Sequence, residues 1–292
     1  MKVGEAGKLM NILGVLFLVV IVSAILRGYM KEGVWSEQLG LNLLVVGDDS
    51  IGVLILRPKE RTASWISLPS DMKIRVTNSP ASYPITSLWR FGVSEKKPYE
   101  IVEKSIGESI GVVIPRVVKM SGKASVEDLL GKLLSITLRT DLSLLDRLAL
   151  RGFLSETVAG KRLLELTVPS QAFDSVEEPD GKVFKVFSLA VNAWSKDKFL
   201  IDSILSENVD LSINNMSGVN GFGLLMARQA ETAGIRVVEI KNDPGDMVVG
   251  KGCFFVIDEG LKWTEKWLQD HFKCKKIESE KGRGEEVKMW LQ

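Results

Sequence analysis

One apolar stretch near the start of the chain constrains it more than any other feature. Residues 9–26 read LMNILGVLFLVVIVSAIL, eighteen residues without a charge and with only Asn11 and Ser23 polar. A helix needs roughly 20 apolar residues, at ~1.5 Å each, to cross the hydrocarbon core of a bilayer. Extending the stretch over Arg27, whose side chain can reach the interface, supplies that length. The sequence therefore predicts a transmembrane anchor over residues 9–29.

Other interpretations of this stretch remain open. Residues 22–24 resemble a signal-peptide cleavage site, although the apolar part of a signal peptide is usually about 7–15 residues long. A buried helix of a soluble domain is the third possibility. Two lysines precede the stretch, and Arg27 and Lys31 follow it, so the positive-inside count is a tie. The N-terminal amine favours residues 1–8 as a cytoplasmic tail, a single pass through the cell membrane, and an extracytoplasmic bulk of the chain.

Composition excludes several classes of function. The 292 residues include 38 Lys and Arg against 37 Asp and Glu, so no general electric field attracts nucleic acid. His271 is the only histidine, and a Ser-His-Asp triad or a Cys-His dyad would have to use it. Cys253 and Cys274 neither require nor exclude a disulfide, and two small core residues are the simpler interpretation. The length allows about two domains.

A domain of alternating strands and helices is predicted over residues 40–205. Apolar runs at 43–46 and 51–56, and the alternating segment 63–76, read as three strands of one sheet. The polar break at 47–50 would lie at a strand end, where binding and catalytic residues are commonly found. Strands that alternate with helices along the chain indicate an α/β layered domain.

Turn and capping residues set the boundaries of the other elements in this domain. Within residues 96–111, Tyr99, Val102, Ile106 and Ile110 lie at helical spacing and predict a helix, with Pro98 in its first turn. The strand within 112–120 is expected at a sheet edge or a bulge, because Pro115 interrupts it. Three further positions carry residue types that begin a helix or form a turn: Ser125 with Asp128, Asp141, and the segment 177–181.

The last part of the chain, residues 207–292, is predicted to form a small α/β sandwich, one sheet with two helices on one face. Gly218, Gly221 and Gly223 lie between its first strand and first helix. Their spacing reverses the dinucleotide-binding fingerprint, and no nearby lysine supports a phosphate site. We expect these glycines to permit positive φ and close packing between helix and strand.

The motifs of the domain at 40–205 resemble those of the LytR-CpsA-Psr family. They are, in order, a strand, GDDS, a second strand, a basic turn, SLPSD, a Tyr-Glu-Ile-Val helix that ends in Ile-Gly, a strand and a Leu-rich helix. The family consists of membrane-anchored bacterial proteins with a large extracytoplasmic domain. Active members transfer glycopolymers from a polyprenyl-pyrophosphate lipid onto peptidoglycan with a divalent metal, which is the activity that the resemblance implies.

The resemblance also implies a degenerate catalytic site. Asp49 looks like the metal-associated aspartate, and Asp71 lies in a turn similar to the family's Pro-Arg-Asp turn, with Ser70 in place of arginine. Arg147 and Arg151 look like the helix arginines, at a spacing of four where the family usually has three. Asp49 and Asp71 would thus hold a metal such as Mg²⁺, and the arginines a pyrophosphate. A missing polar insertion and the missing arginine imply a weakened or absent transferase, and a solvated turn and helix face are the plain alternative.

Residues 207–292 resemble the LytR C-terminal domain. The matching residues are Ile213 to Asn215, Ser217 to Val219, Gly221, Ala233 with Gly234, and Val237 with Val238. That domain has no established catalytic residues, so the resemblance implies binding to the cell wall or to a partner.

Two functions follow from these observations. The first is a membrane-anchored bacterial cell-envelope protein, non-catalytic or weakly catalytic, that contacts the bilayer through residues 9–29 and binds peptidoglycan, a cell-wall glycopolymer or a partner. The second is an active metal-dependent glycopolymer transferase that uses Asp49, Asp71, Arg147 and Arg151. A transcriptional regulator is disfavoured by the balanced charge and by the absence of a recognisable helix-turn-helix.

Overall fold

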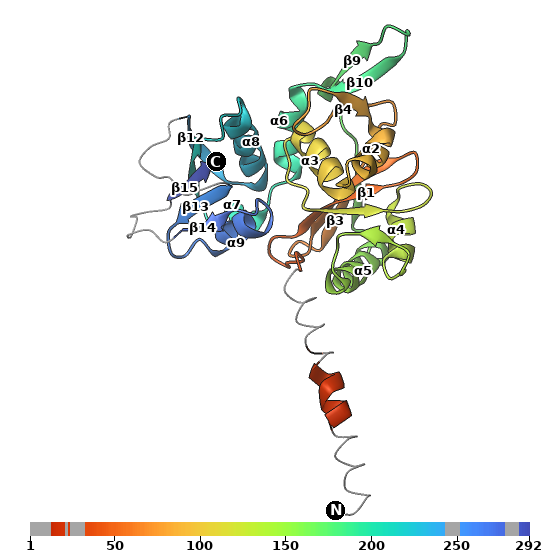
Figure 1. Ribbon diagram of the computed structural model, residues 1–292, viewed down its shortest axis with the longest axis vertical. Helices are drawn as coiled ribbons and strands as arrows, with labels where there is room; N and C mark the ends of the chain where they lie inside the picture. Colours follow the sequence, from red (N-terminus) through yellow and green to blue (C-terminus); the bar gives the residue numbers. More distant parts are fainter. Residues whose placement is uncertain (1–12, 21–22, 24–32, 243–251, 278–285) are drawn as a thin grey trace, which may run out of the picture.

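The computed structural model describes residues 13–20, 23, 33–242, 252–277 and 286–292. Residues 13–20 are helical and exposed, whereas the rest of the predicted anchor, apart from Ser23, and the predicted tail 1–8 lie outside the described residues. Among the helices of the described ranges, none has the length and apolar content needed to span a bilayer. From residue 33 onward the chain forms a large lobe, residues 40–199, beside a small lobe that begins at Ile201 (Figure 1).

A six-stranded sheet in the order β7-β6-β1-β2-β3-β8 forms the centre of the large lobe. Its strands are β1 (Leu41–Val46), β2 (Ile51–Arg57), β3 (Thr62–Leu68), β6 (Arg116–Lys119), β7 (Arg139–Thr140) and β8 (Leu163–Leu166). The pairs β1–β2 and β2–β3 are antiparallel, and β1–β6 and β3–β8 are parallel. The three predicted strands are confirmed as neighbours, but the end of the segment 63–76 leaves this sheet after Leu68.

Helices cover both faces of this sheet, so its central strands are apolar on both sides. The helices and short 3₁₀ turns of the large lobe are η1 (Ile85–Ser87), α2 (Leu88–Ser94), α3 (Pro98–Ile110), α4 (Val126–Lys132), α5 (Leu144–Ala159), η2 (Ser170–Ala172) and α6 (Ala190–Lys198). One face packs on α2, α3 and α6, and the other on α4 and α5. All six residues of β1 and all seven of β2 are buried, which explains the continuous apolar runs in the sequence.

Two small hairpins complete the large lobe. β4 (Lys73–Arg75) pairs with β5 (Ser82–Pro84), and β9 (Phe173–Glu177) pairs with β10 (Val183–Phe187). The β9–β10 hairpin projects beyond the body of the lobe in Figure 1. Its turn confirms the turn predicted at 177–181.

The start of α5 differs from the expectation. The predicted cap, Asp141, is wrong, because Ser143 caps the helix and forms a reciprocal capping box with Asp146. Asp141 instead accepts a hydrogen bond from the backbone N–H of Val117 at 2.8 Å, beside the last strands of the sheet. Both residue types suit a helix start, and tertiary contacts decide between them.

The predicted cap of α4 is confirmed, and the predicted edge position of the strand that follows Pro115 is wrong. Ser125 caps α4 as predicted, and its hydroxyl accepts from the N–H of Asp128 at 3.1 Å. The edge position expected for the strand with Pro115 is wrong, because β6 lies between β7 and β1. Pro115 precedes the first residue of β6, so its missing N–H interrupts no ladder.

The small lobe contains a five-stranded sheet in the order β12-β11-β15-β13-β14. Its elements are α7 (Asp202–Leu205), β11 (Asp210–Asn215), α8 (Phe222–Ala233), β12 (Arg236–Lys241), β13 (Cys253–Ile257), α9 (Lys262–Asp270), β14 (Lys275–Lys276) and β15 (Glu286–Leu291). One core joins α8 and α9 to alternate residues of the strands, among them Leu211, Phe255 and Met289. The predicted arrangement, two helices on one face of one sheet, is confirmed.

The glycine turn before α8 has a conformational role, as predicted. Gly218 and Gly221 have φ angles of 71° and 79°, which other residues rarely adopt. A Cβ on Gly223 would lie 3.0 Å from a methyl group of Ile240 and 3.2 Å from Cβ of Asn215. These glycines therefore let the chain turn and let α8 lie close to the sheet.

Arg57 joins the two lobes at the point where the chain passes between them. Only 7% of this residue is exposed. Its guanidinium donates to the carbonyl oxygens of Phe199 at 2.8 Å and Leu200 at 3.0 Å, and to the side-chain oxygen of Asn42 at 3.2 Å. Burial lowers its pKa to about 10, so it stays charged at neutral pH. Side chains of α8 add a second contact, because Thr232 donates to the carbonyl of Gly111 at 2.9 Å.

Replacing Arg57 with methionine is expected to destabilise the protein. The substitution keeps much of the aliphatic volume but leaves buried carbonyl groups without donors, which costs about 2–4 kcal/mol of the free energy of unfolding. Urea denaturation followed by circular dichroism measures this change. Lys59→Met, at an exposed position of the next turn, is the control and should lie within about 0.5 kcal/mol of the wild type. Equal stability of Arg57→Met and the control would contradict the assigned role.

Candidate functional site

The polar break at 47–50 forms the turn between β1 and β2 and packs against the loop that leads into α4. The N–H of Asp48 donates to the carbonyl of Gly122 at 2.8 Å, and the N–H of Gly122 donates back to the Asp48 carboxylate at 2.7 Å. A Cβ on Gly47 would lie 2.6 Å from backbone atoms of Gly122 and Ala124, so this contact requires glycine. The loop from β6 to α4 is therefore held against the end of the sheet.

Lys119 keeps the Asp48 carboxylate of this turn negatively charged. Its ammonium group donates to the carbonyls of Gly47 and Met120, at 2.8 and 2.9 Å, and to the Asp48 carboxylate at 2.7 Å. The hydrogen bond from Lys119 and the N–H of Gly122 hold the pKa of Asp48 below its usual value. Asp48 is thus a stable carboxylate at neutral pH, and all three N–H groups of Lys119 are in use.

A cleft of about 480 Å³ opens beside this turn. It is lined by Asp48, Lys119, Met120, Ser121, Lys132, Ser135, Thr137, Leu138 and Arg139. Lys132 donates to the carbonyl of Ser121 at 2.8 Å, which leaves two of its N–H groups available. Within the described ranges, the Arg139 side chain is exposed and makes no hydrogen bond or ion pair, while its backbone belongs to β7. Two cations with available donors, together with hydroxyl groups, are suited to an anion such as a phosphate.

The two predicted aspartates lie in different surroundings. Asp49 is exposed next to Asp48 and makes no hydrogen bond among the described residues, and the cleft is lined by Asp48 instead. The motif GDDS offers two aspartates, and in the folded turn Asp48 is the one that accepts hydrogen bonds from the protein, from Lys119 and Gly122. Asp71 forms an ion pair with Lys185 at 2.9 Å, and its carbonyl accepts from the N–H of the same lysine. Asp71 therefore anchors the β9–β10 hairpin.

The two predicted arginines lie on α5. Arg147 donates from its guanidinium to the carbonyls of Leu133 and Ser135, at the C-terminal end of α4. Arg151 lies one turn further along and is exposed. In the part of the chain that the structure describes, no hydrogen bond or ion pair joins any two of Asp49, Asp71, Arg147 and Arg151. Their joint catalytic role stays a prediction.

The residues present do not fit a tightly held divalent cation. Mg²⁺ needs several oxygen ligands in near-octahedral positions, usually including one or two carboxylates. Asp71 is bonded to Lys185, and Asp48 to Lys119. Over the described ranges there is no cluster of three or more His, Cys, Asp or Glu side chains with metal-binding geometry.

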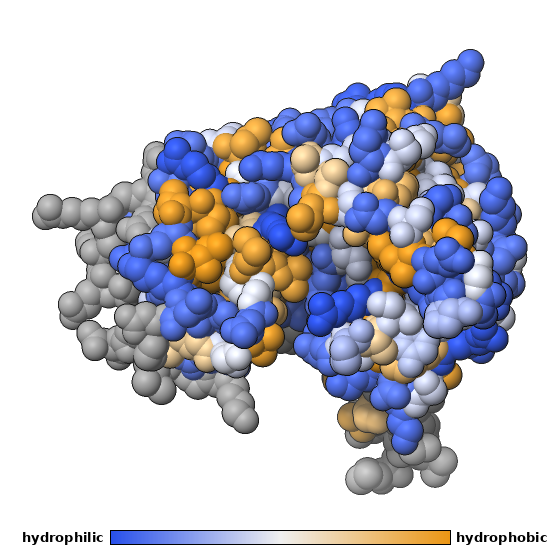
Figure 2. All heavy atoms as spheres, turned by 90° about the horizontal axis from the view of Figure 1, so that it is seen from above, coloured by the Kyte–Doolittle hydropathy of each residue, from blue (hydrophilic) through white to orange (hydrophobic). Residues whose placement is uncertain are grey.

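A second hollow, of about 630 Å³, lies between the lobes (Figure 2). Its walls come from α3 and residues 112–115 of the large lobe, and from α8 and residues 271–273 of the small lobe. Burial, aided by the negative charge of Asp141, raises the pKa of Glu103 to about 7. Burial, aided by the positive charge of Arg116, lowers the pKa of His271 to about 3, so the histidine is neutral at pH 7.

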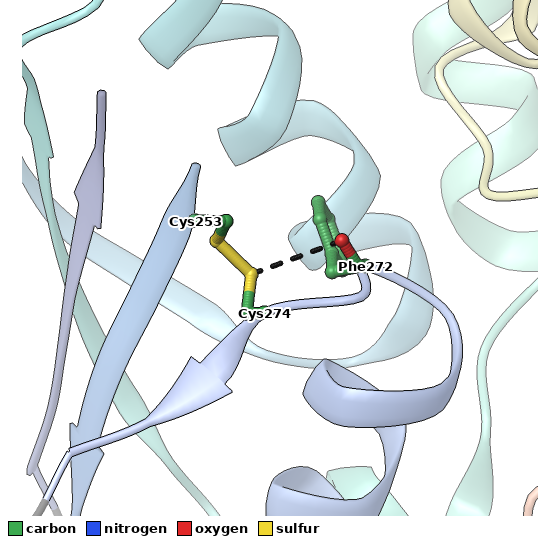
Figure 3. Close-up of a disulfide and its surroundings, with 3 residues drawn as sticks. All are labelled: Cys253, Phe272 and Cys274. Carbon is green, nitrogen blue, oxygen red and sulfur yellow. Dashed lines mark hydrogen bonds between the residues drawn. A yellow bond between two sulfur atoms is a disulfide. The ribbon is translucent and has the colours of Figure 1, made fainter. Parts of the chain in front are cut away.

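The two cysteines form a disulfide between the first residue of β13 and the segment before β14 (Figure 3). The interpretation of two separate core residues is corrected by this bridge, although Cys274 is indeed buried. The carbonyl oxygen of Phe272 lies 3.9 Å from the sulfur of Cys274, beside the hollow between the lobes. Spacing in the sequence could not show that the two chain segments meet. Disulfides persist mainly in oxidising compartments outside the cytoplasm.

Comparisons with known proteins give structural neighbours only. No family model matches the chain, and no curated protein matches its sequence. The solved structure of Bacillus subtilis TagT is 13% identical, covers 56% of this chain and 91% of its own, and has a TM-score of 0.42. Bacillus subtilis TagV is 11% identical over 53% of this chain and 94% of its own, with a TM-score of 0.41. An Enterococcus faecalis protein described as a transcriptional regulator is 14% identical over 53% of this chain and 84% of its own, with a TM-score of 0.40. None of these values assigns a function to this chain.

Glu103→Gln is expected to change how stability depends on pH. The folded-state pKa of Glu103, about 7, lies above the usual value of 4.5 for a glutamate in water. Its contribution to stability is therefore fully present below pH 4.5 and is lost as the pH rises through 7. The glutamine variant should match the wild type at pH 4 and exceed its free energy of unfolding by about 1–3 kcal/mol at pH 8.

Urea denaturation at a series of pH values measures the effect. Glu100→Gln is the control on the same helix, because the Glu100 pKa is lowered by its hydrogen bond with Lys104. This control should gain no stability at pH 8. Parallel pH profiles for the wild type and Glu103→Gln would show that Glu103 ionises normally in the folded protein.

Proposed function

We propose that this protein is a membrane-anchored, extracytoplasmic protein of the bacterial cell envelope that binds an anionic cell-wall glycopolymer. The cleft beside the β1–β2 turn carries the proposal. Its available donors belong to Lys132 and Arg139, and hydroxyl groups of Ser121, Ser135 and Thr137 lie around them. A polymer with repeated phosphate groups offers the charge and oxygen geometry that such a cleft binds.

Two separate features support a location outside the cytoplasm. The apolar residues 9–29 are long enough in sequence to hold the chain in a bilayer. The bridge between Cys253 and Cys274 is of the kind that forms and persists in oxidising compartments. An N-terminus inside the cell and a single pass would place both lobes on the side where the cell wall lies.

The resemblance to the LytR-CpsA-Psr family supports a glycopolymer ligand. In the motifs that carry it, the serine at position 70 and the altered spacing of Arg147 and Arg151 depart from the transferase pattern. The contacts of Asp71 with Lys185 and of Arg147 with two carbonyls occupy side chains that a transferase would aim at a metal or a pyrophosphate. These contacts favour binding over transfer.

Glycopolymer transfer is the second candidate, and the exposed carboxylate of Asp49 is the observation that keeps it open. Transfer would require a divalent metal and a polyprenyl pyrophosphate. Calorimetry with Mg²⁺ and a short-chain polyprenyl phosphate separates the two functions. Binding that is abolished by Asp49→Ala but retained in Asp48→Ala would favour the transferase.

The variant Lys132→Ala with Arg139→Ala is expected to lose glycopolymer binding. Removing the two cationic side chains that have available N–H donors in the cleft should weaken co-sedimentation with purified cell walls by about tenfold or more. Walls whose phosphate-containing polymer has been removed by mild acid should bind neither protein. Lys123→Ala, on the same loop but outside the cleft, is the matched control and should bind like the wild type. Equal binding by the double variant, or equal binding to stripped walls, would refute the proposed function.

A further inference from the structure

Five exposed apolar side chains lie on α5 and on the loop between α4 and β7. They are Leu134, Ile136, Leu144, Leu145 and Leu148, and are called here the α5 leucine patch. Ile136 is 99% exposed, and the three leucines of α5 are each more than 40% exposed. Large apolar side chains grouped in this way mark an interaction surface more often than a solvated one.

Helical geometry and one side chain make the patch continuous. Leu148 follows Leu144 by four positions and Leu145 by three. It therefore lies beside both of them on the surface of α5. Arg147 lies among them and donates to the carbonyls of Leu133 and Ser135. These hydrogen bonds hold the loop that carries Ile136 against the first two turns of the helix.

Cations accompany the apolar side chains. Arg147 and Arg151 follow the leucines at helical spacing, and Arg151 is exposed. Leucines beside arginines on an exposed helix are typical of surfaces that lie in the headgroup region of a membrane, where the apolar groups enter the acyl boundary and the cations contact phosphates.

The entry point of the chain into the large lobe lies beside this patch. Asp146, in the first turn of α5, is 2% exposed. Its carboxylate accepts from the backbone N–H groups of Val34 at 3.3 Å and Trp35 at 2.9 Å. A Cβ on Gly33 would lie 3.4 Å from the same carboxylate. The chain is therefore fixed to the start of α5 at Val34 and Trp35.

Chain length then limits how far the patch can lie from a membrane. Residue 29 is the predicted end of the apolar span, and five residues later the chain is bound at Val34. Five residues reach at most about 18 Å when fully extended. The headgroup layer on one side of a bilayer is roughly 5–8 Å thick. Even a fully extended connection therefore leaves the first turn of α5 within about 10–13 Å of the headgroup layer, and a less extended one brings it to the lipid headgroups.

We propose that the α5 leucine patch docks on the surface of the same bilayer that holds the anchor, with Arg151 at the phosphate level. This inference rests on the anchor of the proposed function. A second copy of the chain or a protein partner would have to displace a membrane that the tether keeps adjacent. Docking would hold the large lobe against the membrane, so that its sheet and its cleft stay at a constant distance from the membrane surface.

Site-specific fluorescence in the full chain tests this proposal. Ile136→Cys, labelled with the environment-sensitive dye NBD, is placed in vesicles of phosphatidylcholine and phosphatidylglycerol. The emission should shift to the blue and be quenched by doxyl-labelled lipid. Val219→Cys, at a 56% exposed position of the small lobe, is the matched control and should be quenched only by aqueous iodide.

A background variant separates docking from mere proximity. Replacing Leu144, Leu145 and Leu148 with serine should abolish lipid quenching at position 136, whereas serine at Leu224, Val238 and Ile240 of the small lobe should not. Circular dichroism confirms that both triple variants are folded.

Iodide quenching at 136 equal to that at 219, in vesicles that still retain the chain after a carbonate wash, would overturn docking while leaving the anchor intact. Concentration-dependent protection at 136 without lipid quenching would overturn it in favour of a second copy. Loss of the chain from the vesicles would instead remove the anchor of the proposed function, and the inference with it.

Discussion

The relation between the two lobes depends on one buried cation. Arg57 ends the central strand β2, and its guanidinium is bonded to two backbone carbonyls of the segment that leaves the large lobe, while no carboxylate of the described residues accepts a hydrogen bond from it. A buried charge is costly unless it is hydrogen-bonded, and here four hydrogen bonds use four of the five N–H donors of Arg57. Because these carbonyls belong to residues 199 and 200, the arginine fixes the path of the chain into the small lobe and thereby the hollow between the lobes.

Much of the fold could be predicted because its strongest local signals agree with the tertiary structure. The runs at 43–46 and 51–56 are apolar on both faces because helices cover both sides of the sheet. Ser125 and the glycines before α8 act through backbone geometry that is local in sequence, so their roles could be read directly. The errors arose where distant segments decide. Asp141 has the chemistry of a cap but bonds to β6, and Pro115 has the chemistry of an edge but lies before the strand begins.

The candidate site was less predictable for the same reason. The sequence selected Asp49, and it could not show that Lys119 at the end of β6 and Gly122 in the following loop both donate to Asp48. Lys132 and Arg139 are ordinary surface residues in the sequence and become a pair only because α4 and β7 meet beside the β1–β2 turn. Cys253 and Cys274 are likewise brought together by strands β13 and β14, which pair in parallel. The cleft, the disulfide and the surface of α5 all follow from contacts between segments that are distant in sequence.

An extracytoplasmic location is the central claim, and the state of the two cysteines in living cells tests it most directly. Cells that express the native chain are lysed in excess alkylating reagent, and the protein is digested without reduction and analysed by mass spectrometry. The account predicts a peptide pair joined through Cys253 and Cys274, with neither cysteine alkylated. Two alkylated cysteines in protein from the membrane fraction would contradict the account, because they would place the small lobe in a reducing compartment.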